Sequence, residues 1–150
     1  MNQVDHKMTE YPLARWLLAA ASIAWLASLA LTGFVVEPAT EPWFGARVLT
    51  YGLLFGWLCH GWAVYANLFF LLAAARLFAG RVPVASTVIM LAFVATLPLF
   101  KGVPRDEGSG TILPLVSWGL GTFLWLGSFG LLVSALVAQM RFISIRRNAL

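Results

Sequence analysis

Residues 48–75, VLTYGLLFGWLCHGWAVYANLFFLLAAA, form a run of 28 positions without a charged side chain. As a single α-helix this run would extend about 42 Å, because each residue adds about 1.5 Å. That length exceeds the hydrocarbon core of one bilayer, roughly 30 Å, and is too short for two full crossings. The run is therefore either one tilted, protruding helix or two segments. We favour a break at Cys59–Gly61, with an interfacial or re-entrant helix over residues 48–58 and a membrane span over residues 62–78.

The composition of the whole chain agrees with a membrane protein. Of its 150 residues, 61% are apolar and 11% are charged, and the mean hydropathy is +0.85. A water-soluble domain is about 45–50% apolar and about 25% charged, so this chain has too few charged side chains to cover such a surface. Disorder requires low hydrophobicity, and a disulfide scaffold requires paired cysteines, whereas only Cys59 is present. The sequence predicts one integral membrane domain over residues 1–150.

Three further apolar runs have the length of a membrane span. They cover residues 16–36, 84–100 and 113–140, and charged residues or prolines lie at their ends. The predicted fold class is therefore all-α, an integral membrane four-helix bundle with an additional short interfacial or re-entrant helix before the second span.

The basic residues indicate the orientation of this bundle. Seven Lys and Arg residues flank one side, whereas the other side has three, Arg47, Lys101 and Arg105. The positive-inside rule then places both chain termini in the cytoplasm, as an even number of crossings requires. The seven residues are Lys7, Arg15, Arg76, Arg81, Arg141, Arg146 and Arg147.

Small residues at a spacing of three or four positions are the expected packing contacts, because small side chains let helix backbones approach closely in a membrane. One such stripe lies in the first span and one in the fourth. We expect the two stripes to pack against each other within a monomer, with a dimer interface as the alternative. Their principal members are Ala20, Ala24 and Ser28 in the first span and Gly127, Gly130 and Ser134 in the fourth.

The predicted spans offer little material for catalysis. No Asp, Glu, Lys or Arg falls within their hydrocarbon portions, and no glycine-rich phosphate loop, nucleophile motif or metal-ligand pair is present. We therefore predict no catalytic, cofactor-binding or metal-ligating residue, no cofactor, and no enzymatic activity. Two polar residues near or within the membrane remain of interest, His60 and Asn67.

His60 lies beside Cys59 at the proposed break. As a metal or haem ligand it would need partners, and the chain offers only Cys59 and the distant His6. We favour an interfacial histidine whose ring is hydrogen-bonded to water or to a backbone carbonyl.

Asn67 lies within a long apolar stretch, where its amide cannot remain unpaired. We favour an interhelical hydrogen-bonded clamp, with Ser28, Thr96 or Ser117 as candidate partners, over a substrate-binding role.

The segment Gly61–Asn67, GWAVYAN, carries the elements of a W-x-x-Y-A-N-P-like motif. In this respect the chain resembles small uncharacterised bacterial inner-membrane proteins with four spans, in which that motif opens the second span. Leu68 stands where the motif has proline, which puts a helix-opening role in doubt. The resemblance implies a multi-pass protein of the bacterial inner membrane and carries no activity with it.

These observations favour a non-catalytic protein that acts through helix–helix interaction with a membrane partner, of the accessory-subunit or toxin-immunity type. The alternative is a small oligomeric transporter or channel subunit. The expected partners are the lipid bilayer and either another membrane protein or further copies of the chain. Nucleic acid is not expected despite a net charge of +4, because the arginines lie where membrane topology requires them.

Overall fold

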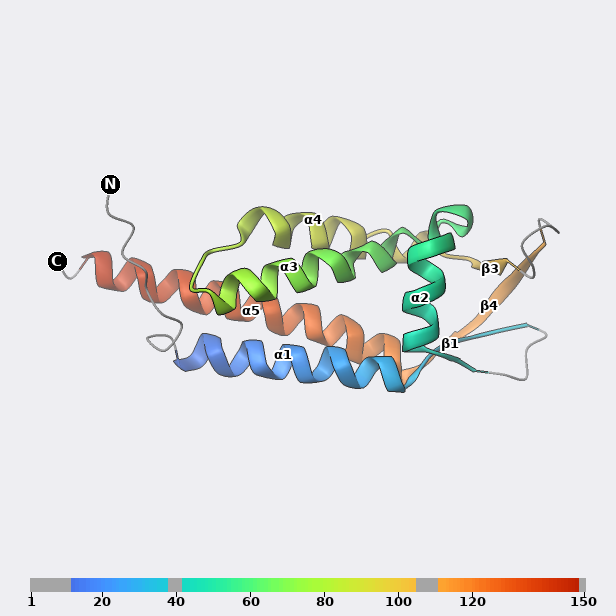
Figure 1. Cartoon of the computed structure of the whole chain (residues 1–150), viewed down its shortest axis with the longest axis horizontal. Helices are drawn as coiled ribbons and strands as arrows, with labels where there is room; N and C mark the ends of the chain where they lie inside the picture. The colour runs from blue at the N-terminus through green and yellow to red at the C-terminus, as the bar shows by residue number, and fades with distance from the viewer. Residues whose placement is uncertain (1–11, 38–41, 105–110, 149–150) are drawn as a thin grey trace.

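The structure is a computed structural model that describes residues 12–37, 42–104 and 111–148. Four helices lie alongside one another, an antiparallel sheet lies beyond one end of them, and a fifth helix lies across that end (Figure 1). In chain order the elements are α1 (Pro12–Ala30), β1 (Thr32–Val36), β2 (Trp43–Phe44), α2 (Gly45–Phe55), the 3-10 helices η2 (Gly56–Cys59) and η3 (Trp62–Tyr65), α3 (Ala66–Phe78), α4 (Val84–Val94), the 3-10 helix η4 (Leu97–Leu99), β3 (Gly102–Pro104), β4 (Ile112–Trp118) and α5 (Leu120–Asn148).

Two of the helices are long and apolar enough to cross a membrane. α1 has 19 residues and α5 has 29. Within the described part of the chain the other apolar helical stretches, Trp62–Phe78 and Val84–Leu99, are shorter. The structure therefore has two candidate membrane-spanning helices, and the prediction of four was wrong.

The prediction of an all-α fold was also wrong, because the chain forms a four-stranded antiparallel sheet with strand order β2-β1-β4-β3. β1 takes up the last part of the predicted span 16–36, and β4 takes up the first part of the predicted span 113–140. Phe34 of β1 lies opposite Trp118 of β4. Aromatic and β-branched residues favour strands, but a short apolar run has the same hydropathy in a strand as in a helix.

The C-terminal ends of α4 and α5 also differ from the predicted span limits. α4 ends at Val94, before the predicted limit of residue 100, and a 3-10 turn that contains Pro98 follows it. Proline lacks a backbone N–H and disrupts the preceding helical turn, which explains the early end. α5 continues past the predicted limit of residue 140 to Asn148. Its last turns therefore contain the basic residues Arg141, Arg146 and Arg147.

The predicted break in the uncharged run 48–75 is confirmed. α2 ends at Phe55, η2 follows, and His60 has a left-handed φ of 57° before η3 begins. The second segment, Trp62–Phe78, has the predicted bounds, whereas the first helix begins at Gly45 rather than at residue 48. The turn allows α2 to lie across the end of the bundle (Figure 1).

Two apolar clusters hold these elements together. The larger cluster fills the centre of the bundle, and the smaller one lies between the sheet and its neighbours. The most deeply buried members of the larger cluster are Ala14, Ala21, Ala66, Phe70, Ala73, Leu77, Met90, Phe129, Leu132 and Ala135, and the smaller cluster is built on Phe34, Val36 and Val103.

α1 and α5 pack against each other as predicted, but most of the predicted small residues lie outside the contact. On α1, Ser28 is buried, whereas Ala24 is half-buried and Ala20 is exposed. On α5, Gly121 is buried, and a methyl group added there would lie 3.1 Å from the carbonyl of Ser28, whereas one added at Gly127 or Gly130 would meet nothing within 4 Å. The reason is volume, because α5 fills the bundle with larger side chains on its opposite face. The exposed stripe residues of α5 are Gly127, Gly130 and Ser134.

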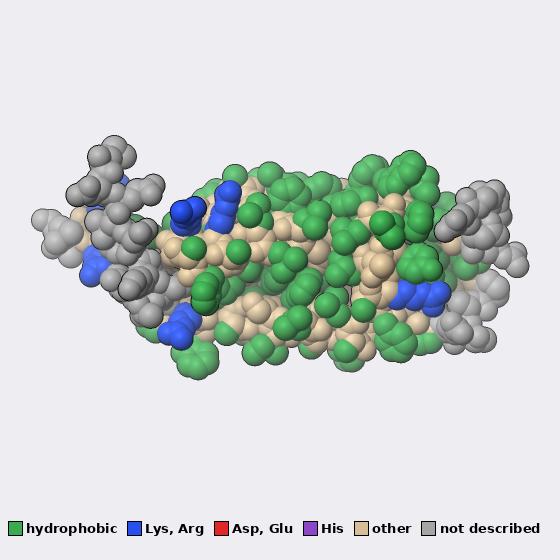
Figure 2. Space-filling model, in the orientation of Figure 1, with side chains coloured by type: hydrophobic (Ala, Val, Ile, Leu, Met, Phe, Trp, Pro, Cys, Tyr) green, Lys and Arg blue, Asp and Glu red, His purple; other side chains and the backbone are tan. Residues whose placement is uncertain are grey.

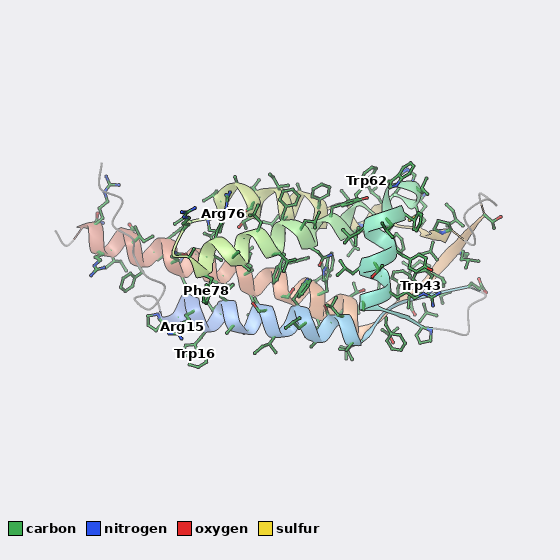
Figure 3. The ribbon with its side chains drawn as sticks, viewed as in Figure 1. Arg15, Trp16, Trp43, Trp62, Arg76 and Phe78 are labelled. Atoms are coloured by element: carbon green, nitrogen blue, oxygen red, sulfur yellow. The ribbon has the colours of Figure 1, made fainter. Side chains whose placement is uncertain are left out.

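The surface of the bundle is predominantly apolar. Figure 2 shows hydrophobic side chains along the middle of the face in view, with Lys and Arg confined to its two ends. Arg15, Trp16, Arg76 and Phe78 lie at the end opposite the sheet, and Trp43 and Trp62 lie toward the sheet (Figure 3). Trp16 and Phe78 are 75% and 74% exposed, which is unfavourable in water but suits the edge of a bilayer.

Candidate functional site

A pocket of about 820 Å³ lies where α2, η2, η3 and the sheet meet the ends of α1, α3 and α5. We call it the sheet-end chamber. Its size falls in the range of about 300–1,000 Å³ that is typical of small-molecule sites. The lining is mainly apolar, and its aromatic members are Phe34, Trp43, Tyr51, Phe55, Phe100, Trp118 and Trp125.

Asn67 lies on the bundle side of the chamber and joins three helices. Its Oδ1 accepts hydrogen bonds from the indole Nε1–H of Trp25 on α1, at 2.7 Å, and of Trp125 on α5, at 2.8 Å. Its Nδ2 donates to the carbonyl of Val64, at 2.7 Å. Asn67 is only 4% exposed, so an unpaired amide here would cost several kcal/mol. The three hydrogen bonds remove that cost; we call this arrangement the Asn67 clamp.

Aromatic contacts fix the two indoles of the Asn67 clamp. The Trp25 ring stacks on Phe70, with centroids 5.8 Å apart and planes inclined by 16°. The Trp125 ring meets Phe129 edge-on at 4.5 Å. Such pairs contribute about 0.5–1.5 kcal/mol each beyond their buried area, so they orient both N–H groups toward Asn67.

Sequence reasoning selected Asn67 but not its partners. The candidates Ser28, Thr96 and Ser117 were wrong, because the clamp uses Trp25 and Trp125 instead. Ser28 donates to the carbonyl of Trp25 within α1, and Thr96, in the turn after α4, donates to the carbonyl of Phe93. A tryptophan in an apolar helix carries a donor that needs an acceptor, and that signal could have suggested both partners.

The two hydroxyl side chains of serine and threonine in the lining are also engaged within the fold. Thr122 Oγ1 donates to the carbonyl of Gly33 at 2.7 Å, which ties the start of α5 to β1. Ser28 Oγ donates to the carbonyl of Trp25 at 2.6 Å. Because these groups already have partners, the interior of the chamber presents chiefly hydrocarbon and aromatic surface.

Arg47 is the single charged side chain among the described residues that line the chamber. Its guanidinium carbon lies 4.3 Å from the centre of the Trp43 ring and 5.8 Å from that of Tyr51. Cation–π contacts of this kind are worth about 0.5–1 kcal/mol at exposed sites. They hold the exposed guanidinium at the rim of the chamber.

Close contact between α2 and η3 shapes the chamber wall. A methyl group added to Gly52 would come within 2.7 Å of Val64 Cγ2, closer than real carbon contacts allow. Glycine at this position therefore lets the two segments touch. Val64 also accepts the hydrogen bond from Asn67, so the wall and the Asn67 clamp share a residue.

His60 and Cys59 lie at the turn between η2 and η3. His60 is exposed at the left-handed position, and Cys59 is buried with its Sγ 3.6 Å from the carbonyl of Gly56. Burial raises the pKa of the Cys59 thiol above its ordinary value. Within the described residues no group of three His, Cys, Asp or Glu side chains could hold a metal ion.

Gln139 is a buried polar residue near the C-terminal end of the apolar part of α5. It is fully buried, and its Nε2 donates to the carbonyl of Gly80 at 3.0 Å. Its Oε1 has no hydrogen-bond partner. The bond to Gly80 joins this side chain to the turn between α3 and α4.

Comparison with known proteins yields no match to a protein-family model, to a curated protein or to a solved structure. The resemblance built on Gly61–Asn67 therefore stays a prediction. In the structure this segment forms η3 and the first turn of α3, which places Asn67 at the Asn67 clamp.

Proposed function

We propose that the protein is a non-catalytic, multi-pass protein of the bacterial inner membrane that binds another membrane component in the sheet-end chamber. The observation that carries this proposal is the chamber itself, which combines an apolar aromatic interior with the guanidinium of Arg47 at its rim. Asn67, Ser28 and Thr122 are engaged in hydrogen bonds of the fold, which suits binding of an apolar group better than bond chemistry or ion passage.

Membrane residence is supported by the two long apolar helices and by the apolar surface between the charged ends. Bacterial origin and the inner membrane rest on the sequence resemblance alone. We propose binding of the accessory-subunit or toxin-immunity type, because the described residues form a helical bundle, a small sheet and the sheet-end chamber.

The distribution of charge supports cytoplasmic termini. Within the described residues, six arginines belong to the helix ends opposite the sheet, whereas Arg47 and Lys101 lie on the sheet side. The positive-inside rule then puts the sheet and the chamber on the outer side. A phosphatase that is active only outside the cytoplasm, fused to the C-terminus, is expected to be inactive, and activity would overturn this orientation. The six arginines are Arg15, Arg76, Arg81, Arg141, Arg146 and Arg147.

The binding proposal is tested in native membranes by photo-crosslinking. A small diazirine-bearing amino acid replaces Leu49, which lines the chamber, or Leu26, which is 59% exposed on the outer face of α1. We expect a discrete adduct from position 49 that is lost when Leu97→Trp fills the chamber from η4, and only diffuse lipid labelling from position 26. Identical adducts at both positions, or an adduct at position 49 that survives Leu97→Trp, would refute binding in the chamber.

A further inference from the structure

We propose that the ligand of the sheet-end chamber is an anionic phospholipid, with one acyl chain inside the chamber and its phosphate at Arg47. This inference rests on the proposed function and deepens it by naming the ligand class. Three features of the chamber carry it: the engaged polar groups of the lining, the interfacial position of the rim, and the geometry of the guanidinium.

The first feature selects a hydrocarbon chain over a peptide. Asn67 Oδ1 already accepts two hydrogen bonds, and Thr122 donates to Gly33. An extended peptide would bring unpaired N–H and C=O groups into this interior, and a helix end would bring four of one kind. Each unpaired group costs several kcal/mol in an apolar medium, whereas an acyl chain brings none.

The second feature places the entrance at the level of lipid headgroups. Trp43, Tyr51 and Trp57 surround this end of the molecule, and such rings concentrate at the membrane–water boundary. Tyr51, Leu58 and Ile112 line the chamber and are 48%, 50% and 46% exposed, so the chamber opens to the surface beside these rings. A lipid can therefore insert a chain while its headgroup stays at the boundary.

The third feature selects an acidic headgroup. Arg47 is held over Trp43 at 4.3 Å, at the rim where a headgroup would lie. A guanidinium has five donors in a planar fork, which bind two oxygens of a phosphate at once and leave donors for other partners. A zwitterionic headgroup such as choline would bring a second cation close to this guanidinium, whereas the headgroup of an anionic phospholipid brings none. A free fatty acid would offer one carboxylate, but the membrane around the chamber supplies phospholipid in large excess.

The experiment uses the full chain, delipidated and reconstituted with photoactivatable lipids. Phosphatidylglycerol, phosphatidylcholine and the free fatty acid carry the same diazirine acyl chain, and crosslinked peptides are mapped by mass spectrometry. We expect adducts on chamber-lining peptides of α2 and η4. Phosphatidylglycerol should be favoured over phosphatidylcholine by about tenfold, because the choline ammonium would be repelled by the guanidinium of Arg47. Arg47→Gln should remove that preference, and Arg47→Lys should restore part of it.

Variants that fill the chamber distinguish loss of lipid binding from loss of the folded structure. Leu49→Trp and Leu97→Trp fill the chamber from two walls, and Leu26→Trp adds the same side chain on the outer face of α1. Both filling variants should lose the chamber adduct while they melt at the temperature of Leu26→Trp. Equal labelling by phosphatidylglycerol and phosphatidylcholine, a preference for the fatty acid, or labelling confined to outward-facing helices would overturn the assignment of an anionic phospholipid. A protein adduct at position 49 in native membranes, with no lipid adduct on the chamber lining, would leave the proposed function standing and refute this inference alone.

Discussion

Replacement of Asn67 by leucine tests whether the Asn67 clamp holds the bundle together. Leucine keeps the approximate volume but removes the oxygen that accepts the indole N–H groups of Trp25 and Trp125. A buried donor left without a partner costs about 1–3 kcal/mol, so two such donors cost about 2–6 kcal/mol. Both tryptophans are half-buried, and interhelical hydrogen bonds in membranes average about 0.6 kcal/mol, which favours the lower part of that range. We expect Asn67→Leu to lower the free energy of unfolding by about 2–3 kcal/mol without changing topology.

The assay is unfolding of the reconstituted chain in mixed micelles with a rising fraction of SDS, followed by circular dichroism and fitted as a two-state transition. Ser134→Leu is the matched control, because Ser134 is exposed and bonds only within α5, to the carbonyl of Gly130. It should change stability by less than about 0.5 kcal/mol. Double-mutant cycles with Trp25→Phe and Trp125→Phe should give coupling energies above about 0.5 kcal/mol. An Asn67→Leu protein as stable as the Ser134→Leu control, or zero coupling to both tryptophans, would refute the clamp.

Three further predictions concern the chamber wall, a buried amide and a buried thiol. Gly52→Ala should lower the free energy of unfolding by about 1–3 kcal/mol, because its methyl group would press on Val64 at 2.7 Å; the same micelle titration measures it, and an unchanged midpoint would show that α2 can shift. Gln139→Met should cost no more than about 1 kcal/mol, since it removes a buried Oε1 without a partner along with the single bond to Gly80; a loss as large as that of Asn67→Leu would mean that Oε1 has a partner, such as a buried water. The Cys59 thiol, whose pKa is raised by burial, should react with maleimide more slowly than a free cysteine at neutral pH. Its rate should go on rising with pH beyond the range in which a free cysteine has fully ionised, and a plateau at the ordinary pKa would contradict burial.

Local composition accounts for the parts of this protein that could be predicted. The excess of apolar over charged residues predicts a membrane protein whatever the fold, because it depends on totals alone. The break at Cys59–Gly61 follows from a length argument, since 28 uncharged residues suit neither one crossing nor two. Asn67 stands out because an amide in an apolar run needs a partner wherever that run lies.

Features that depend on which segments contact one another in three dimensions could not be predicted from the sequence. Hydropathy gives the same signal for β1 and β4 as for the helices that continue them, so only antiparallel pairing shows that they are strands. The partners of Asn67 depend on the rotation of α1 and α5 about their axes, which the packing of large side chains decides. That rotation turns the small stripe of Gly127, Gly130 and Ser134 outward and encloses Gln139. The sheet-end chamber exists because α2 lies across the end of the bundle, so tertiary packing alone places Arg47, Asn67 and the aromatic lining around one space.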